Sequence, residues 1–478
     1  MPYYRPQDSR PDARALAALA DAAPVPYWQD DPAAPVPAAA GALTDRTEAD
    51  LLVVGGGYTG LWSALLAKQR DPDRDVLLVE AATCGRAASG RNGGFCAASL
   101  THGLANGLAR WADEMATLER LGAENLAGLL TDLDRYGVDA DVERTGELDV
   151  AVAPWQVEHL RETARTADRL GRRLEWLDRD AVRTEVDSPL FLGGVWDRDG
   201  VVLLHPTKLA WGLRRACLDL GVRLHERTPA RSLVTDGAAV RVGTPYGGVR
   251  ARRVVLATNA FPPLLRRLGA YVVPVWDYAL VTEPLSPEQK TAIGWRNRQG
   301  VGDAGNQFHY YRLTADDRIL WGGFDAVYGF GGARGSDREQ RPETFAALAA
   351  HFLSTFPQLE GLRFTHAWGG LIDTCTRFSA FVGTAALGRV GYAAGYTGLG
   401  VGATRFAAAA VLDLLDGVDS EAARLEMVRR RPLPFPPEPV RWVGIEATRR
   451  ALARADRAGG RRNAWLRTLD RLGLGFDS

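Results

Sequence analysis

The residues with the clearest chemical role form a run from 55 to 60, Gly-Gly-Gly-Tyr-Thr-Gly, which fits the pattern GxGxxG. In that pattern the first glycine permits a tight turn, the second lets the backbone approach a pyrophosphate, and the third lets a helix pack on a strand. Glu80 lies 20 residues beyond Gly60, where a carboxylate hydrogen-bonds ribose hydroxyls. Gly55, Gly57, Gly60 and Glu80 therefore predict a dinucleotide site; a glycine turn used only for packing is the alternative.

The elements around this run are those that a dinucleotide site needs. Residues 50–54 (DLLVV) predict a buried strand, residues 60–70 a helix and residues 75–80 a second strand. Two parallel strands need such a crossover helix, and its N-terminus presents free N–H groups and a positive dipole end to a phosphate. The glycine run thus lies where a strand ends and a helix begins.

Two further glycine-rich segments extend the prediction. Residues 88–95 (ASGRNGGF) combine the charge of Arg91 with small residues that let an anion approach the backbone, which suits FAD better than NAD. A flexible turn around Asn92 is the alternative there. Residues 395–402 (GYTGLGVG) precede a predicted helix at 402–416, whose N-terminus is suited to stabilising negative charge on a reduced flavin. The alternative for this segment is close helix packing.

The rest of the chain predicts further helices and strands. Apolar spacing indicates helices at 104–135, 156–173, 206–220 and 343–355, a hairpin at 192–204, and strands at 222–227, 238–243 and 253–257. Residues 270–325 alternate in the manner of an antiparallel sheet, and no fixed-period repeat is present. Residues 1–48 are rich in Pro and Ala and predict an extended arm, either pinned by Tyr27 and Trp28 or loose.

Composition and charge exclude several classes of function. A chain of 478 residues suggests two to four domains, and a net charge of zero argues against a chain-wide basic surface for nucleic acid. The scattered cysteines Cys84, Cys96, Cys217 and Cys375 disfavour a disulfide scaffold or zinc site, and no histidine spacing suggests any metal. Without an apolar run of spanning length or an apolar N-terminus, we expect a soluble, cytoplasmic protein with no membrane contact.

Taken in order, these motifs resemble the D-amino-acid, glycine and sarcosine oxidase family of FAD-dependent amine oxidoreductases, most closely its gamma-glutamylputrescine oxidase branch. The matching segments are 26–28 (PYW), 54–61 (VGGGYTGL), 89–94 (SGRNGG), 205–206 (HP), 257–260 (ATNA), 311–312 (YR), 368–373 (WGGLID) and 396–401 (YTGLGV). The resemblance implies an α/β fold, with a Rossmann-like FAD-binding domain and a second α+β substrate domain built on a mainly antiparallel sheet.

The resemblance also implies a division of the chain into domains. The FAD-binding domain would be discontinuous, comprising 49–135, 156–185, 203–265 and 365–420. The substrate domain would comprise 136–155, 186–202 and 266–364, leaving 1–48 as the arm and 421–478 as a C-terminal tail. The tail contains thirteen Arg against seven Asp or Glu, a stiff segment at 431–439 and predicted helices at 441–458 and 461–472. We expect it to pack on the body; a subunit contact in a homo-oligomer is the alternative.

Residues of the glycine segments and two positions beyond them are the FAD contacts that the resemblance implies. They are Gly55, Gly57, Tyr58, Thr59, Gly60, Glu80, Ser89, Gly90, Arg91, Asn92, Gly93, Gly94, Ala230, Thr258, Thr397, Gly398, Leu399, Gly400 and Val401. Cys375 lies near the position where some sarcosine oxidases attach FAD covalently, but its spacing to Gly383 is shorter. We therefore expect a buried cysteine and non-covalent FAD.

The implied reaction is oxidative deamination of a small amine, amino acid or polyamine derivative. Hydride leaves the carbon next to nitrogen for flavin N5, and the imine then hydrolyses. No catalytic residue is assigned, because the flavin carries the chemistry if desolvation lowers the pKa of the amine. Two alternatives stay open: a sarcosine-like N-demethylation, and a flavin-binding protein or complex subunit without amine turnover.

The candidate substrate contacts are His309, Tyr310, Tyr311, Arg312 and Trp368. On a strand, His309 and Tyr311 share one face while Tyr310 and Arg312 share the other. Arg312 is suited to an anionic group on the substrate, although these side chains are equally suited to a core. His102 is expected to be an ordinary loop or cap histidine; a contact with the flavin face is the alternative.

The electron acceptor is open between oxygen and another molecule. Some oxidases of the family place a lysine near flavin N5, but none of Lys68, Lys208 and Lys290 clearly matches such a position. An oxidase is favoured over a dehydrogenase.

Overall fold

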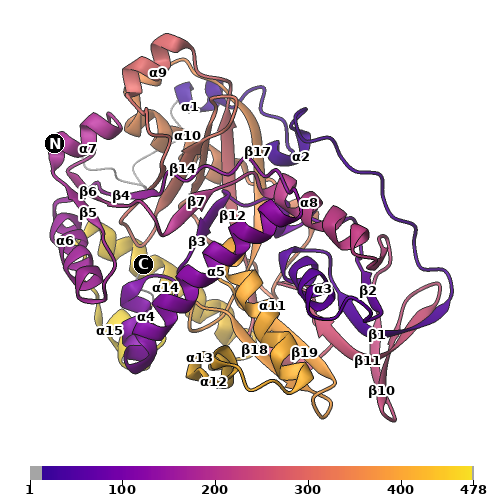
Figure 1. Ribbon diagram of the computed structural model, residues 1–478. Coiled ribbons are helices and arrows are strands. Elements are labelled where there is room, and N and C mark those ends of the chain that lie inside the picture. Colours follow the sequence, from indigo (N-terminus) through magenta and orange to yellow (C-terminus); the bar gives the residue numbers. More distant parts are fainter. Residues whose placement is uncertain (1–12, 476–478) are drawn as a thin grey trace.

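The computed structural model describes residues 13–475, which form two large β-sheets with helices around them (Figure 1). The first sheet has the strand order β18-β19-β11-β1-β2-β8, with the β9–β10 hairpin added beside β11. Its strands are β1 (Arg46–Val54), β2 (Val76–Val79), β8 (Arg223–His225), β9 (Ser232–Asp236), β10 (Ala239–Gly243), β11 (Gly248–Leu256), β18 (Phe381–Ala385) and β19 (Val390–Ala394).

The centre of the first sheet is parallel, as a Rossmann-like domain requires. β1 pairs in parallel with β2 and β11, β2 with β8, and β11 with β19. The central strands are buried on both faces because helices cover one face and a second apolar cluster, which includes Val240 and Val242 of β10 with Leu268 and Val272, covers the other. The covering helices are α3 (Tyr58–Arg70), α5 (Met115–Arg135), α8 (Pro206–Asp219) and α11 (Gly400–Asp416). The predicted strand–helix–strand unit is therefore confirmed.

The second sheet has the strand order β16-β12-β15-β14-β13-β4-β6-β5, with β17 beside β12. All its pairs are antiparallel except β13 with β4, so the predicted fold class is confirmed. Its strands are β4 (Glu147–Ala151), β5 (Glu175–Leu177), β6 (Gly193–Asp197), β12 (Val273–Thr282), β13 (Gly300–Asp303), β14 (His309–Leu313), β15 (Ile319–Gly323), β16 (Val327–Tyr328) and β17 (Phe364–Thr374).

The first sheet and its helices form one half of the molecule, and the second sheet and its helices form the second half. Helices and a small third sheet complete the second half and the region between the two large sheets. α10 packs on α1 and β12, and α6 and α7 pack on β6. The helices and strands of these regions are α1 (Ala13–Ala18), α4 (Leu104–Trp111), α6 (Pro154–Arg169), α7 (Arg179–Glu185), α9 (Pro287–Ile293), α10 (Pro342–Thr355), β3 (Phe95–Ala97) and β7 (Val201–Leu203). In the described part of the chain, no helix has both the length and the apolar character needed to span a bilayer.

The hairpin predicted at 192–204 is wrong. Strands do form there, but β6 pairs with β4 and β5 in the second sheet, whereas β7 pairs with β3. Apolar alternation predicts strands but not their partners, and here the two strands diverge to different sheets.

The N-terminal arm differs from the extended segment that was predicted. Its described part contains two short helices, α1 and α2 (Tyr27–Asp30), while the prediction for residues 1–12 lies outside the described residues. Tyr27 and Trp28 do pin the arm: the Tyr27 hydroxyl donates to Asp316 at 2.7 Å, and Trp28 Nε1 donates to the carbonyl of Asn92 at 2.8 Å. The arm therefore contacts both halves of the molecule.

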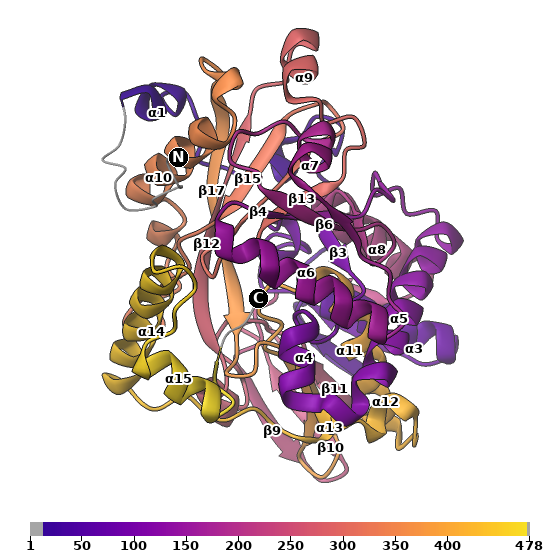
Figure 2. The same ribbon diagram turned by 90° about the vertical axis from the view of Figure 1, so that its left-hand side faces the viewer.

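The C-terminal tail packs on the body rather than extending from it. It contains α12 (Glu421–Arg424), α13 (Glu426–Arg429), α14 (Val440–Arg457) and α15 (Ala464–Arg471). In the view of Figure 2, α14 and α15 lie on one side of the region in front of the second sheet, with α4 and α6 on the other.

Candidate functional site

The turn between β1 and α3 has the geometry that the glycine run predicts. Gly55 has φ of +113°, and a Cβ there would lie 2.4 Å from the carbonyl oxygen of Ala257. A Cβ on Gly60 would lie 1.8 Å from the carbonyl oxygen of Gly55. Any side chain at either position would therefore separate the helix from the strand or distort the turn. α3 therefore begins directly beyond the carboxyl end of β1.

Glu80 follows β2 at the same edge of the first sheet. Its carboxylate accepts hydrogen bonds from the backbone N–H of Gly56 at 2.6 Å and of Ala82 at 2.8 Å. Burial raises the pKa of Glu80, and these hydrogen bonds oppose that shift. The Glu80 carboxylate is thereby held beside the glycine turn, where a hydrogen-bond partner for the ribose of a dinucleotide is expected.

The second glycine segment is fastened to the first. The Ser89 hydroxyl accepts a hydrogen bond from the backbone N–H of Tyr58 at 2.9 Å, and the Asn92 side chain accepts one from Gly94 N–H at 2.9 Å. Arg91 directs its guanidinium toward the second half, where it pairs with Glu339 at 2.8 Å and donates to the carbonyl of Gly369. Arg91 therefore links the two halves of the molecule, whereas the sequence predicted only a contact with a phosphate.

The third glycine segment is held by Asp373 at the end of β17. Its carboxylate accepts hydrogen bonds from the backbone N–H groups of Gly395 at 2.6 Å and Tyr396 at 3.2 Å. Burial raises the pKa of Asp373 to about 7. A Cβ on Gly402 would lie 2.2 Å from the carbonyl oxygen of Ala97, so α11 packs closely on β3. The Thr59 hydroxyl donates to the Tyr396 hydroxyl at 2.8 Å, which joins this segment to α3.

All three segments line one cavity of about 1960 Å³, whose opposite wall is a face of the second sheet. Ligand pockets typically have volumes of about 300–1,000 Å³, so this cavity has room for a dinucleotide and a second molecule. Sixteen of the nineteen predicted FAD contacts line it, Ala230 and Thr258 among them. The other three, Gly60, Gly90 and Gly94, are buried beneath the lining, where a Cβ would meet backbone carbonyl oxygens.

Tyr310 occupies the centre of the sheet face that lines the cavity. Its cross-strand neighbours are Gly302 and Gly322, and a Cβ on Gly322 would lie 2.6 Å from the Tyr310 ring. The ring also lies against Gly93 of the second glycine segment, and its hydroxyl donates to Asp277 at 2.7 Å. The glycines on neighbouring strands thus leave space that the tyrosine occupies.

Asp277 is a site residue that the sequence reasoning missed. It lies on β12 and lines the cavity, and burial raises its pKa to about 6 although the Tyr310 hydrogen bond opposes that shift. The available signal was a charged residue within an otherwise apolar strand. A carboxylate with this pKa changes its charge close to neutral pH, which is typical of functional sites.

Two more carboxylates face the cavity from β4. A Cβ on Gly302 would lie 3.0 Å from Asp149 Oδ1 and 3.6 Å from Glu147 Oε1, so both carboxylates lean over one glycine. Burial raises the pKa of each carboxyl, and neighbouring carboxylates raise both further. Arg172 lies nearby but pairs with Asp197 and with Glu119. This wall of the cavity therefore favours a positively charged ligand.

The five candidate substrate residues separate into three groups: two line the cavity, two lie in the core on the opposite face of the sheet, and Arg312 bonds to other segments of the protein. Tyr310 and Trp368 line the cavity, and Trp368 Nε1 donates to the carbonyl of Arg91 at 2.9 Å. His309 and Tyr311 lie on the opposite face, in the core, as the alternation predicts. There His309 lies 2.8 Å from Asp303 Oδ2 and 3.1 Å from His351 Nδ1. Neither side chain is placed to contact a ligand in the cavity.

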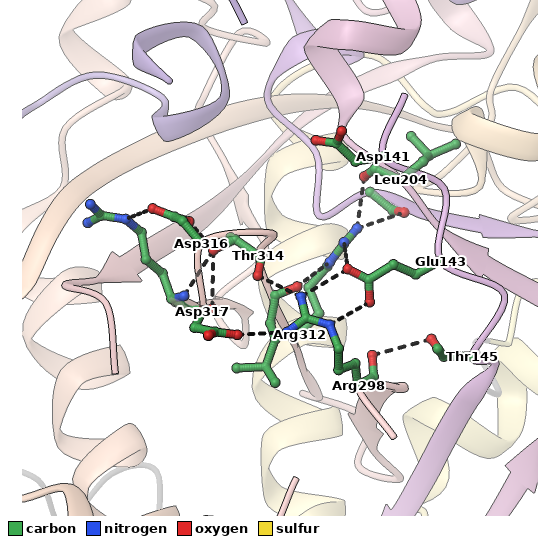
Figure 3. A network of polar contacts seen from close by, with 12 residues as sticks. Asp141, Glu143, Thr145, Leu204, Arg298, Arg312, Thr314, Asp316 and Asp317 are labelled. Carbon is green, nitrogen blue, oxygen red and sulfur yellow. Dashed lines mark hydrogen bonds and ion pairs between the residues drawn. The ribbon is translucent and has the colours of Figure 1, made fainter. Parts of the chain in front are cut away.

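Arg312 shares a strand face with Tyr310 but does not line the cavity. Figure 3 shows it within a network of polar contacts that includes Leu204, Glu143 and Arg298. It is 2% exposed, and its guanidinium donates to the carbonyl oxygens of Leu204 at 2.8 Å and Leu313 at 3.1 Å. Glu143 lies 4.0 Å away and forms a second ion pair with Arg298 at 3.0 Å. The structure therefore uses Arg312 to join segments of the protein, not to bind the expected anionic group.

The remaining residues considered from the sequence lie as follows. His102 lines the cavity beside Thr397, and burial lowers its pKa. Cys375 is buried outside the lining, with its thiol directed at the carbonyl oxygens of Ser379 and Gly395. None of the three lysines, all of which lie in the described part of the chain, belongs to the lining; they are Lys68, Lys208 and Lys290.

Comparison with known proteins agrees with this architecture. The family model described as FAD dependent oxidoreductase matches residues 50–414. The chain is 34% identical to gamma-glutamylputrescine oxidoreductase of Escherichia coli over 82% of this chain and 89% of that protein. It is 27% identical to a probable oxidoreductase, OrdL, of Haemophilus influenzae over 80% and 86% of the two chains.

Solved structures show the same fold. Glycine oxidase from Geobacillus kaustophilus superposes with a TM-score of 0.66 at 20% identity, covering 81% of this chain and 99% of that one. The family match, the curated relatives and the glycine-lined cavity lead to one conclusion: this chain belongs to the FAD-dependent oxidoreductase family, as an enzyme acting on amines or amino acids.

Proposed function

We propose that the protein oxidises the C–N bond of a positively charged amine, using non-covalently bound FAD, and releases a carbonyl compound and a smaller amine. The observation that carries this proposal is a cavity whose first wall consists of three glycine segments and whose second wall carries carboxylates that form no ion pair with any described residue. The discontinuous division into an FAD-binding and a substrate domain, described above from the sequence, is part of the same proposal.

The residues present fit FAD. The glycine turn at 55–60 would hold the pyrophosphate, Glu80 the ribose, and the segments at 89–94 and 397–401 the flavin end. When bound, the flavin supplies the acceptor for the hydride that leaves the carbon next to nitrogen. The chain's own residues must then bind the amine, orient it, exclude water and accept its proton.

Asp277 and Tyr310 are the residues we assign to the amine. An alkylamine is protonated at neutral pH, and its nitrogen needs a free lone pair before the neighbouring carbon can lose hydride. Asp277 is ionised above about pH 6, so its carboxylate can bind the ammonium group and take its proton. The Tyr310 hydroxyl donates to Asp277 Oδ2 at 2.7 Å and fixes the orientation of that carboxylate, while the Tyr310 ring lies against Gly93.

Glu147 and Asp149 favour a substrate with excess positive charge. Their carboxylates face the cavity and form no ion pair with any described residue, although nearby Arg172 lowers the pKa of both, whereas Arg312, the expected anion-binding residue, is engaged elsewhere. A cationic amine or polyamine derivative therefore fits this wall of the cavity better than an amine with an anionic group.

The test is anaerobic mixing of the purified, FAD-loaded protein with a panel of amines while the visible absorption of the flavin is followed. Bleaching by a cationic amine is the expected result. A yellow protein that no amine bleaches would refute amine oxidation. Release of formaldehyde would identify N-demethylation instead of deamination, and the rate at which air restores the colour separates an oxidase from a dehydrogenase.

A further inference from the structure

The C-terminal tail contributes a wall to the cavity, although it lies beyond residues 50–414, which the family model matches. Side chains from the extended segment before α14, from α14 itself and from α15 all belong to the lining. Figure 2 places α14 and α15 opposite α4 and α6, whose residues also line the cavity. The wall is therefore a feature of this chain in addition to the family fold.

The tail is fastened to the second sheet at the start and middle of α14. Glu438 accepts hydrogen bonds from the Tyr328 hydroxyl at 2.6 Å and from Gly331 N–H at 3.2 Å. Arg449 forms an ion pair with Asp325 at 2.9 Å. These partners lie in or beside β16, in the segment that follows β15.

Two further contacts fix the far end of the tail. Asp456 is 7% exposed, and its carboxylate accepts hydrogen bonds from the backbone and side-chain nitrogens of Asn306 and from Gln307 N–H, at 2.6–3.1 Å. On the opposite side, Arg110 of α4 donates to the carbonyl oxygens of Gly473 and Gly475 at 3.0 Å. Because it is bonded on both sides, the tail has a fixed position at the edge of the cavity.

The cavity side of this wall is mostly apolar, with Arg441 and Arg449 as its charged residues. Leu433 is 56% exposed, Val440 59%, Trp465 42% and Leu472 59%, yet all four line the cavity. Single exposed apolar side chains are ordinary, but several gathered around one cavity mark a place where an apolar group binds. The carboxylates of Asp277, Glu147 and Asp149 lie on the sheet that forms another wall of the same cavity.

We infer that the tail is the wall that determines substrate length and that it contacts an apolar chain of several carbons attached to the reacting amine. The inference rests on the proposed function and narrows its substrate class to elongated amines. The carboxylates bind the charged nitrogen, and the apolar wall covers the methylene groups beyond it. A cavity of about 1960 Å³ leaves room for such a molecule in addition to the cofactor.

The inference is tested with a series of linear primary amines of increasing chain length. In the wild-type protein, each methylene covered by the tail should raise kcat/KM for flavin reduction by about fourfold, the equivalent of about 0.8 kcal/mol. Trp465→Ala and Leu472→Ala should lose this increase for long amines and keep the wild-type rate for the shortest. Val443→Ala is the matched control, because Val443 is 56% exposed on α14 but does not line the cavity.

A second readout measures binding without turnover. Alkyltrimethylammonium ions have no nitrogen lone pair to support oxidation, so their dissociation constants follow from the change they cause in the flavin spectrum. Affinity should rise with alkyl length in the wild type and in Val443→Ala, and should rise less in the two wall variants. A chain-length response that is flat in the wild type, or unchanged in both wall variants, would overturn the inference. If no amine is oxidised but affinity still rises with length, the proposed function fails while the wall stands.

Discussion

Replacing Asp277 by Asn would remove one charge from the cavity while preserving the shape of the side chain. In the wild type, burial raises the pKa of this carboxyl from 3.8 to about 6. The folded chain therefore binds the proton more tightly than the unfolded chain does. At about 1.36 kcal/mol per pKa unit, ionised Asp277 destabilises the fold by at most about 3 kcal/mol.

The sign of the pH dependence follows from the raised pKa. Below pH 3.8 the carboxyl is neutral in both states and imposes no penalty. As pH rises from 3.8 to about 6, the unfolded chain ionises first and the folded state loses stability relative to it. Above that range the penalty is constant. Asp277→Asn should therefore be more stable than the wild type at about pH 8, by up to about 3 kcal/mol, and the gain should disappear near pH 4.

The same substitution should lower the rate of amine oxidation. In the wild type, kcat/KM for flavin reduction should fall about tenfold per pH unit below about pH 6, because Asp277 must be ionised to accept the proton. Asp277→Asn should lower the rate by about 10²–10⁴-fold at neutral pH and remove the Asp277-dependent step on the acid side. Anaerobic stopped-flow measurement of flavin reduction across pH, paired with urea unfolding at two pH values, provides both readouts.

Tyr310→Phe is the matched control, because it keeps the carboxylate and removes only the hydrogen bond at 2.7 Å. That bond favours the ionised form, so its loss should move the acid-side step to higher pH without abolishing it. An Asp277→Asn protein that keeps the wild-type rate and pH profile, or that is less stable than the wild type at about pH 8, would refute the reasoning.

Three other substitutions test separate parts of the structure. Gly60→Ala places a Cβ 1.8 Å from the carbonyl oxygen of Gly55 and should abolish FAD retention, which is measured as the ratio of flavin to protein absorbance. Gly41→Ala is the control and should retain FAD, because a Cβ there would have no atom within 4 Å. Asp149→Asn should weaken binding of cationic amines by about tenfold, with FAD content unchanged, whereas an unchanged KM would show that the amine does not reach β4. Arg312→Met should lower the free energy of unfolding by about 3 kcal/mol, because carbonyl oxygens and Glu143 lose a buried partner. Urea titration measures that loss, and a KM for amines that rises while stability is kept would restore Arg312 as a substrate contact.

The half of the molecule that holds the dinucleotide was largely predictable from the sequence. Its signals are local: a strand, a glycine turn and a helix follow one another within residues 46–70, and each glycine has one steric reason. The second sheet was less predictable. Alternation showed that His309 and Tyr310 point to opposite faces, but which face meets the cavity depends on strands brought together from distant parts of the chain.

The carboxylates and the tail show why the rest could not be predicted. Asp149 and Gly302 become neighbours only because β4 pairs with β13, which lies about 150 residues later in the chain. Asp277 gains its raised pKa from burial that no local pattern reports. The hairpin predicted at 192–204 also failed because of strand pairing, since β6 pairs with β4 and β5 whereas β7 pairs with β3.

The strand order of the first sheet also has a consequence for the biosynthesis of the protein. β19 pairs with β11, and the third glycine segment follows β19 directly, so part of the cofactor site is translated only after residue 394. The strand at 46–54 can pair with β2 early, but its other neighbour, β11, is made some 200 residues later. A ribosome-bound chain therefore exposes an incomplete parallel sheet for most of its synthesis, and FAD can bind only late. We expect chaperones to bind the unfinished chain during this period.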